Sequence, residues 1–257
     1  MQYENFVIYE QPLNEHIRLC QRLEYLFQQA NYHINLETNW DSEAALTTIF
    51  NILNVIDRPD LKNKLAQLLN QYASNLAQME QLPDINKQRL LRILEQVQST
   101  IDLLHSLHGK IGQELRENEF LMSVQQRILT PAGTCSFNAP AYYLWMQQTP
   151  QVRQKKLKEW FESFKGLEIV TSLLLKLTRS SVKPQDEIGH SGFYQTNLDP
   201  NSNYQMIRIF IPKNLNVFPE ISVGRHRLTI HFLELNVESK SSQTNKDIPF
   251  KIAFCKL

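Results

Sequence analysis

The spacing of the hydrophobic residues changes from a helical to a strand pattern close to residue 182. Before that point the apolar residues recur at helical spacing almost continuously from Asn14 onward. After it they fall in short runs that are typical of strands. Because the two patterns occupy separate parts of the chain, the sequence predicts an α+β protein. We expect a helical bundle domain over residues 13–182 and an antiparallel β-sheet domain over residues 183–257.

A short strand pattern also stands alone at the N-terminus. Phe6–Tyr9 is an apolar run with aromatic and β-branched residues, Pro12 ends it, and Asn14 can cap the helix that follows. No second strand pattern lies nearby in the sequence. We therefore expect this strand to pair with the distant C-terminal sheet, so that residues 1–12 belong to the β-domain.

Capping residues and prolines mark the expected element boundaries. Besides Asn14, the expected helix starts are Asp41 as an N-cap and Pro59, Pro83, Pro140 and Pro150 in first turns, and Gly166 is expected to separate the last two helices. The expected C-terminal strands lie at 192–198, 204–212, 226–235 and 248–257. Residues 212–224 and 236–247 are interpreted as connecting loops, the second of them a mobile hairpin loop.

Composition and cysteine content indicate a globular protein of the cytoplasm. The chain is 42% hydrophobic and 21% charged. It contains no apolar run approaching the ~20 residues that span a membrane. Its N-terminus lacks the basic start and apolar core of a secretory signal. Cys20, Cys135 and Cys255 form an odd set with no close pair, so we interpret them as reduced thiols.

The charges are unevenly distributed along the sequence although the net charge is only +1. Residues 1–120 hold 10 Lys and Arg against 16 Asp and Glu, whereas residues 121–257 hold 17 against 10. A basic half favours an acidic partner, and a nucleic-acid-binding protein is the alternative function that this asymmetry leaves open. The other interpretation is a solvated surface whose charges happen to segregate along the chain.

The motifs of enzymes and metal sites are missing from the sequence. Only seven glycines occur, and none forms a phosphate-binding G-x-G-x-x-G loop. The segment GHSGF differs from a nucleophile elbow, G-x-S-x-G, because Gly192 follows Ser191 directly. His105 and His108 are only two ligands, and no third candidate is near them in sequence. We therefore expect no catalytic residue, no metal and no cofactor.

The segment GRHRLTIHFLEL carries the most informative local pattern. As a strand, it would turn Leu228, Ile230 and Phe232 to the core and Arg225, Arg227, Thr229 and His231 to the opposite face. At roughly 3.3 Å per residue, Arg227 and His231 would lie about 13 Å apart. Such a row can bind an extended acidic peptide, because arginine makes forked, charge-assisted hydrogen bonds to carboxylates. An ordinary solvated sheet face would show the same polar alternation.

The densest basic run is RQKKLKEW at residues 153–160. It contains no interleaved exposed aromatic residues, and the sequence pI is near neutral, about 7.7. These features favour a solvated helix face with Leu157, Trp160 and Phe161 turned inward over a nucleic-acid patch.

Four segments, in this order over nearly the whole chain, resemble landmark segments of a known family. They are YEQPLNEHIRLCQRLEYLF at 9–27, CSFNAPAYYLW at 135–145, SGFYQ at 191–195 and FPEISVGRHRLTIHF at 218–232. Together they resemble the ZapD (YacF) family of bacterial cell-division proteins. The resemblance implies a non-enzymatic protein at the mid-cell division ring that forms homodimers. It also implies that the partner is the C-terminal tail of the tubulin-like protein FtsZ, whose protofilaments the dimer cross-links and bundles, with no role for a membrane or nucleic acid.

The resemblance also implies site residues. The basic pocket of the family falls on Arg58 and Arg227, with Arg225 beside them, and the next arginine of the family pattern is His231 here. A histidine carries only part of a charge near neutrality, so binding is expected to be weaker or more sensitive to pH. In the first helix Arg22 matches an arginine of the family pattern and is expected at a dimer or interdomain contact. Two further basic positions of the family hold Glu119 and Tyr143, to which we assign no role.

Overall fold

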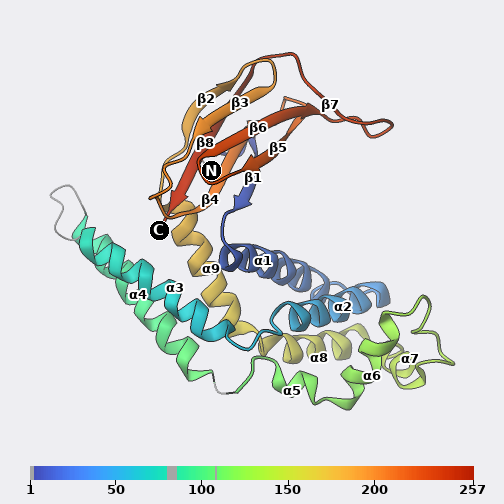
Figure 1. Cartoon of the computed structure of the whole chain (residues 1–257). Coiled ribbons are helices and arrows are strands. Elements are labelled where there is room, and N and C mark those ends of the chain that lie inside the picture. The colour runs from blue at the N-terminus through green and yellow to red at the C-terminus, as the bar shows by residue number, and fades with distance from the viewer. Residues whose placement is uncertain (1–2, 80–85, 108) are drawn as a thin grey trace. The chain divides into compact units, whose positions relative to one another are not determined.

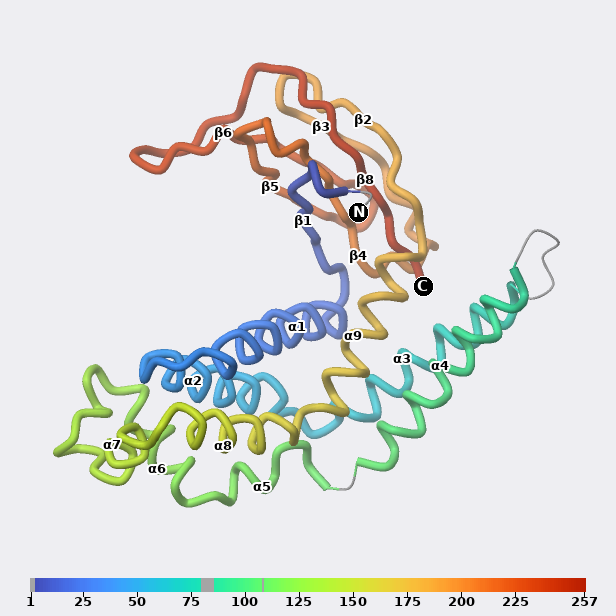
Figure 2. Tube along the Cα trace, turned by 180° about the vertical axis from the view of Figure 1, so that it is seen from behind, coloured from blue at the N-terminus to red at the C-terminus, as the bar shows by residue number. Residues whose placement is uncertain are grey.

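The computed structural model describes residues 3–79, 86–107 and 109–257, and within it the chain divides into two compact units (Figure 1). Residues 1–18 and 175–257 form the first, which we call the β-unit, and residues 19–174 form the second, the helical unit. The first and last strands, β1 (Phe6–Pro12) and β8 (Ile248–Lys256), therefore belong to the same unit and are labelled in Figure 2. Two helices, α1 (Glu15–Ile34) and α9 (Lys165–Ser180), are continuous across the unit boundaries.

The helical unit is built from short and medium-length helices. Between α1 and α9 these are α2 (Asn39–Val55), α3 (Leu61–Gln78), α4 (Lys87–Ser106), α5 (Gln113–Arg116), α6 (Glu119–Ile128), α7 (Pro140–Met146) and α8 (Pro150–Glu162). Helices α3 and α4 lie side by side in both views. Elsewhere the core is made by leucines, isoleucines and phenylalanines, and the rings of Phe27 in α1 and Phe161 in α8 meet edge to face at 6.1 Å.

Three of the expected helix starts are confirmed. The Oδ1 atom of Asn14 accepts a hydrogen bond from the backbone N–H of Ile17 at 2.8 Å, which caps α1. Pro140 and Pro150 occupy the first turns of α7 and α8, where a missing N–H costs nothing. The start expected at Pro83 lies outside the described residues.

Three expected boundaries are wrong. Helix α2 begins before Asp41, because Thr38 is the N-cap and Asp41 is the third helical residue of a capping box; the Thr38 Oγ1 atom accepts from the Asp41 N–H at 3.1 Å. Pro59 precedes α3, whose first residue is Leu61. Gly166 lies inside α9, and the break between α8 and α9 falls at Ser163 and Phe164 instead.

The β-unit contains two antiparallel sheets rather than the single small sheet expected from the sequence. The first has the strand order β1 (Phe6–Pro12), β4 (Tyr204–Pro212), β8 (Ile248–Lys256), β2 (Gln185–Gly189); the second has the order β3 (Phe193–Asn197), β6 (Arg227–Glu234), β5 (Val217–Val223), with β7 (Ser242–Gln243) also paired to β6. Strands β2, β5 and β7 were not expected. β2 and β5 are edge strands, and they carry residues that disguise a strand pattern: Asp186 and Glu187 in β2 and Pro219 in β5.

The predicted pairing of the N-terminal strand is confirmed. Strand β1 runs antiparallel to β4 from the pair Phe6–Pro212 to the pair Pro12–Met206, and the N–H of Leu13 donates to the carbonyl of Gln205 at 2.9 Å. The α+β fold class is therefore confirmed as well.

The core of the β-unit lies between the two sheets. Isoleucines of β4 and Ile252 of β8 belong to the same buried cluster as Leu228, Ile230 and Phe232 of β6. The rings of Phe232 and Phe250, from opposite sheets, are 5.0 Å apart between centroids. The unit is therefore a small β-sandwich whose second sheet turns one face outward.

Candidate functional site

Strand β6 alternates between buried and outward-facing residues, as its sequence predicts. Leu228, Ile230 and Phe232 are fully buried, whereas Arg227, Thr229 and His231 lie on the outer face of the second sheet. In the neighbouring strand β5, Ser222 pairs with Thr229, and Glu220 pairs with His231. The outer face therefore carries the Glu220 carboxylate beside Arg227 and His231, and the sequence of β6 alone did not indicate this carboxylate.

His231 is held in place by its neighbours. Its Nδ1 atom lies 2.8 Å from Oε1 of Gln243, and the Nε2 group of the same amide donates to the carbonyl of Ser191 at 3.0 Å. The second bond orients the amide, so Nδ1 of His231 is the donor to Oε1. The imidazole ring also packs against Phe193, 5.0 Å between centroids. The Nε2 edge of the ring is the part that remains for a ligand.

Arg225 is not on the strand face, contrary to the sequence pattern, because β6 begins only at Arg227. Arg225 belongs to the tight turn between β5 and β6, which the N–H of Gly224 closes by donating to the carbonyl of Arg227 at 2.8 Å. From this turn it lines a hollow of about 410 Å³ within the β-unit, together with Arg18, Asp199 and Tyr204. Of the predicted site residues, Arg227 and His231 thus share one strand face and Arg225 lies in the adjoining turn.

Arg58 belongs to the helical unit and lines a different hollow, of about 470 Å³. Lys62 and Lys110 lie in the same wall. The Lys62 ammonium group donates to backbone carbonyls of Leu107 and Gly109, and Lys110 bonds the carboxylate of Asp57. The hydrogen bond from Lys110, together with the charges of Arg116 and Lys110, lowers the pKa of Asp57. The hollow around Arg58 is therefore basic in character.

The polar stripe of α1 is exposed. Arg18 and Glu15 form an ion pair at 2.9 Å, while Tyr25 exposes 68% of its surface. Arg22 is exposed too, and it makes no hydrogen bond or ion pair within the described part of the chain. Glu119 is the first residue of α6. Tyr143 lies exposed in α7.

The basic run of α8 is less basic at the surface than in the sequence. Leu157, Trp160 and Phe161 are buried, as expected, but Arg153 is buried as well, with 3% of its surface exposed. Its guanidinium donates to Oγ of Ser42 at 3.0 Å and to the carbonyl of Glu37 at 2.7 Å. It also donates to the carbonyls of Met146, at 3.2 Å, and Gln148. Of the basic residues of this run, only the lysines face solvent.

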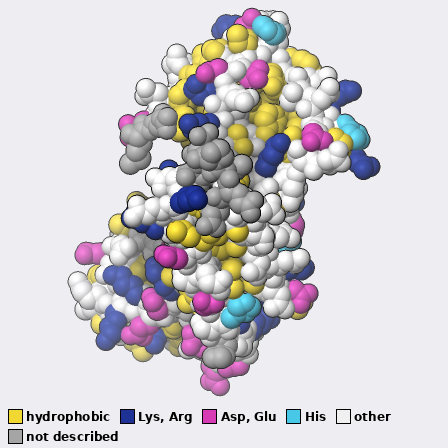
Figure 3. All heavy atoms as spheres, turned by 90° about the vertical axis from the view of Figure 1, so that its left-hand side faces the viewer, with side chains coloured by type: hydrophobic (Ala, Val, Ile, Leu, Met, Phe, Trp, Pro, Cys, Tyr) yellow, Lys and Arg dark blue, Asp and Glu magenta, His cyan; other side chains and the backbone are white. Residues whose placement is uncertain are grey.

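Folding also removes the charge asymmetry between the two halves of the sequence. The β-unit holds 12 Lys and Arg against 10 Asp and Glu, and the helical unit holds 15 against 16. On the face drawn in Figure 3, cationic and anionic side chains are interspersed rather than gathered into one basic area. The net charges of the two units, +2 and −1, are therefore closer to each other than those of the two sequence halves.

The segment GHSG forms a turn that carries the chain from β2 in the first sheet to β3 in the second. Ser191 and Gly192 both have left-handed backbone angles, with φ of 50° and 71°, as in a type I′ turn. The Asp247 carboxylate accepts a hydrogen bond from the Ser191 N–H at 2.9 Å and lies 3.1 Å from Nδ1 of His190, and these two contacts lower its pKa. His190 and Asp247 are both more than half exposed. This arrangement is a solvated turn.

Two constellations were not visible in the sequence. One is an ion cluster of Glu10 with Arg179 and Arg208, and the other is a hollow lined by Phe120, Trp145 and Trp160. Each draws its members from three separate elements, so no local spacing could indicate them; the density of aromatic residues in α7 and α8 was the only available signal. In the described part of the chain no group of three His, Cys, Asp or Glu side chains is arranged for a metal ion. None of its helices is both long and apolar enough to cross a membrane.

Comparison with known proteins identifies the family. The family model described as "ZapD: Cell division protein" matches residues 21–231. A protein of Coxiella burnetii named Cell division protein ZapD is 40% identical over 253 residues, which cover 98% of each chain. Proteins of the same name from Methylococcus capsulatus and Dechloromonas aromatica are each 34% identical, over 99% and 98% of this chain and 100% of theirs. The chain therefore belongs to the ZapD family of cell division proteins.

Proposed function

We propose that this protein is a non-enzymatic division factor that binds the C-terminal tail of FtsZ in the cytoplasm. As a homodimer it cross-links and bundles FtsZ protofilaments at the mid-cell division ring. Membership of a cell division family supports the process, and the FtsZ partner and the bundling mechanism are what the resemblance to that family implies.

The observation that carries the proposal is the outer face of β6. Arg227 and His231 project from alternate positions of a rigid strand, with Thr229 between them, and Arg225 follows in the adjoining turn. An extended peptide has a similar spacing of side chains, so successive carboxylates can meet these groups in register. Arg58, in its basic hollow of the helical unit, is proposed as a further contact to the tail.

We expect charge-assisted hydrogen bonds to make the main contribution to the free energy of binding. Removing one arginine that makes a charge-assisted hydrogen bond costs about 1.5–3 kcal/mol, which corresponds to a complex roughly ten- to a hundredfold weaker. Because the groups face solvent, affinity is also expected to fall as salt rises, since the screening length is about 8 Å at physiological ionic strength.

Titration of a synthetic FtsZ tail peptide tests the site. Arg227→Glu is expected to weaken binding by at least tenfold, and Arg225→Glu and Arg58→Glu are expected to weaken it as well. Lys213→Glu is the matched control, because it makes the same charge change at an exposed position of the β-unit. Arg153 is unsuitable as a control, since its replacement would disturb the core. Equal losses for Lys213→Glu and Arg227→Glu would show that only overall charge matters and would contradict the site.

Co-sedimentation tests the partner. The protein is expected to pellet with FtsZ filaments and to remain in the supernatant when the FtsZ tail is deleted. Pelleting that does not depend on the tail would refute tail binding, and tight binding to arbitrary duplex DNA with a steep dependence on salt would favour the nucleic-acid alternative.

A further inference from the structure

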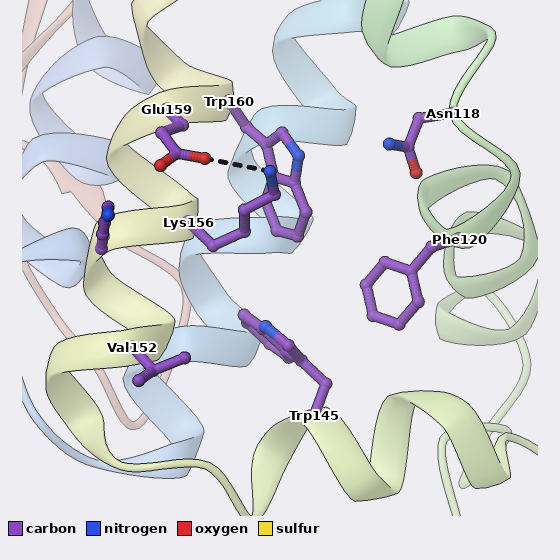
Figure 4. Close-up of a pocket in the computed structure, with 8 residues that line it drawn as sticks. Asn118, Phe120, Trp145, Val152, Lys156, Glu159 and Trp160 are labelled. Carbon is purple, nitrogen blue, oxygen red and sulfur yellow. Dashed lines mark hydrogen bonds and ion pairs between the residues drawn. The ribbon is translucent and has the colours of Figure 1, made fainter.

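The helical unit contains a hollow of about 560 Å³ with three aromatic walls (Figure 4). Phe120 comes from the start of α6, Trp145 from α7 and Trp160 from α8. Their ring centroids are 5.9 Å apart for the two tryptophans, 6.0 Å for Phe120 and Trp145, and 6.1 Å for Phe120 and Trp160. Cavities that hold ligands fall at roughly 300–1,000 Å³. This hollow is therefore large enough to receive an apolar side chain of a partner.

The rim of the hollow is charged on the α8 side. Val152, Lys155, Lys156 and Glu159 follow one another at helical spacing along this side. Lys156 bonds Glu159 at 2.9 Å and lies 5.6 Å from the centroid of the Trp160 ring. A cation thus already covers one aromatic wall, and Lys155 adds a second positive charge at the rim. A cationic ligand would be repelled, whereas carboxylates beside the entrance would be attracted.

The opposite rim offers a polar group for a peptide backbone. The Oδ1 atom of Asn118 accepts the N–H of Leu121 at 3.0 Å and so caps α6. The amide N–H₂ of Asn118 is then oriented by this cap, and Figure 4 shows the amide directed toward the space between the aromatic rings. It can donate a hydrogen bond to a peptide carbonyl.

We propose that this hollow is a second docking site, which binds a partner peptide through one aromatic anchor residue flanked by acidic residues. The anchor packs in the hollow against Phe120, Trp145 and Trp160, whose rings already contact one another, and the acidic residues meet Lys155 and Lys156. All these groups lie in the helical unit, so the site does not include the β6 face proposed for the FtsZ tail.

Tryptophan fluorescence measures the binding of a probe peptide to this hollow directly. The chain has three tryptophans, and Trp40 is 79% exposed, so a Trp40→Phe background leaves Trp145 and Trp160 as reporters. The probe is a capped pentapeptide with one phenylalanine between two pairs of aspartates. It is expected to change the emission saturably. Replacing its phenylalanine by alanine, or its aspartates by lysines, is expected to weaken binding about tenfold or more.

Variants of the protein locate the site. Lys155→Glu is expected to lower the affinity for the probe about tenfold. Lys158→Glu makes an equal charge change on the same helix away from the hollow, and it should change the affinity less than about twofold. Trp145→Leu should abolish the emission change while the helical circular dichroism is retained. Arg227→Glu should have no effect on this probe, which separates the site from the tail-binding proposal.

Several outcomes would overturn the proposal. No emission change at millimolar probe, equal binding of the lysine peptide, or equal effects of Lys155→Glu and Lys158→Glu would each do so. An emission change caused by phosphatidylcholine vesicles containing one-third phosphatidylserine, but not by the probe, would assign the hollow to a membrane surface. A change that follows protein concentration alone would assign it to a second copy of the chain.

Discussion

At the residue scale, Arg153 shows how a side chain that looks like part of a binding patch can instead hold a core together. Its acceptors belong to the α1–α2 connection, the first turn of α2 and the end of α7, and none of them is a carboxylate. Sequence reasoning could not find this role, because two of the acceptors, on Glu37 and Ser42, lie more than a hundred residues away and most of the acceptors are backbone carbonyls. By contrast, the outer face of β6 could be predicted, since strand alternation depends only on neighbouring residues.

Removing the Arg153 guanidinium should therefore destabilise the helical unit strongly. Arg153→Met removes the guanidinium that bonds the carbonyl of Met146 in a buried contact and that of Glu37 in a partly buried one, and a loss of about 3 kcal/mol in the free energy of unfolding is expected. Urea denaturation followed by circular dichroism measures it. Lys155→Met on the same helix is exposed and should stay within about 0.5 kcal/mol of the unmodified protein. Similar losses of unfolding free energy in the two variants would show that the hydrogen bonds of Arg153 do not stabilise the helical unit.

The thiols provide a second prediction at this scale. Burial, followed by the charge of Glu24, raises the pKa of Cys20 to about 12, and burial raises the pKa of Cys255 as well. Neither thiol is then ionised at pH 8, whereas Cys135 is partly exposed. One fast-reacting thiol is expected with Ellman's reagent in the folded protein and three in denaturant. Cys135→Ser should remove the fast reaction, and a fast reaction that persists in this variant would contradict the assignment.

The raised pKa of Cys20 also has a consequence for stability at alkaline pH. In the unfolded chain this thiol ionises near its ordinary value of 9.0, and in the folded protein only near 12. The folded state therefore holds the proton more tightly. Stability from this group is complete below pH 9 and is lost progressively as the pH rises toward 12.

At the scale of elements, the N-terminal strand is attached by an ion cluster as well as by its pairing with β4. The Glu10 carboxylate accepts hydrogen bonds from Nη2 and Nε of Arg179 in α9, at 2.7 and 2.9 Å, and from Nε of Arg208 in β4, at 2.9 Å. The side chains of Glu10 and Arg208 are only 15% and 14% exposed. The cluster thus connects β1, α9 and β4 within the β-unit.

Glu10→Gln is expected to destabilise the β-unit by about 3 kcal/mol, because it leaves two partly buried cations without their carboxylate. High salt should change this loss little, since the cluster is shielded from solvent. The measurement is denaturant unfolding at low and high salt, with the exposed Glu238→Gln as the matched control. A cost below about 1 kcal/mol would place the cluster among ordinary surface ion pairs.

The elements that sequence reasoning missed share a physical cause. The pairing of β1 could be predicted because a strand must satisfy its backbone hydrogen bonds and no partner was near. Strands β2 and β5 lie at sheet edges, where half of the backbone faces away from the ladder and charged residues or proline are tolerated. Their sequences therefore lack the alternation that marks β6. Once β5 and β7 are included, β6 becomes the central strand of a second sheet rather than part of one small sheet.

At the scale of the whole molecule, the order of elements predicts the fold class. The distribution of charge along the sequence, by contrast, does not predict the net charges of the folded units. The asymmetry between the two halves suggested a basic domain, yet the folded units differ by only a few charges. The reason is that the boundary between the sequence halves at residue 120 lies inside the helical unit, which combines an acidic first part with the basic run of α8. Local clusters such as those around Arg58 and Arg225 are where we propose that an acidic partner binds.

The proposed bundling activity depends on the number of chains in the molecule, because one tail site per chain can hold only one filament. Cross-linking needs two such sites in one particle, and a dimer supplies them. Arg22, exposed on α1 and without a partner in the described part of the chain, is proposed at the contact between two copies. Arg22→Ala is therefore expected to weaken the dimer about tenfold, as measured by sedimentation equilibrium, with the helix content unchanged.

The same variant separates binding from bundling. At concentrations where Arg22→Ala is monomeric, it should bind the FtsZ tail peptide with unchanged affinity, because the β6 face is intact in each chain. It should, however, fail to bring FtsZ filaments down in low-speed centrifugation, which collects only bundles. Arg92→Ala is the matched control, since Arg92 is exposed on α4 and lies outside the α1 stripe. A monomeric variant that still bundles filaments would mean that one chain carries two filament sites, and the mechanism proposed here would then be wrong.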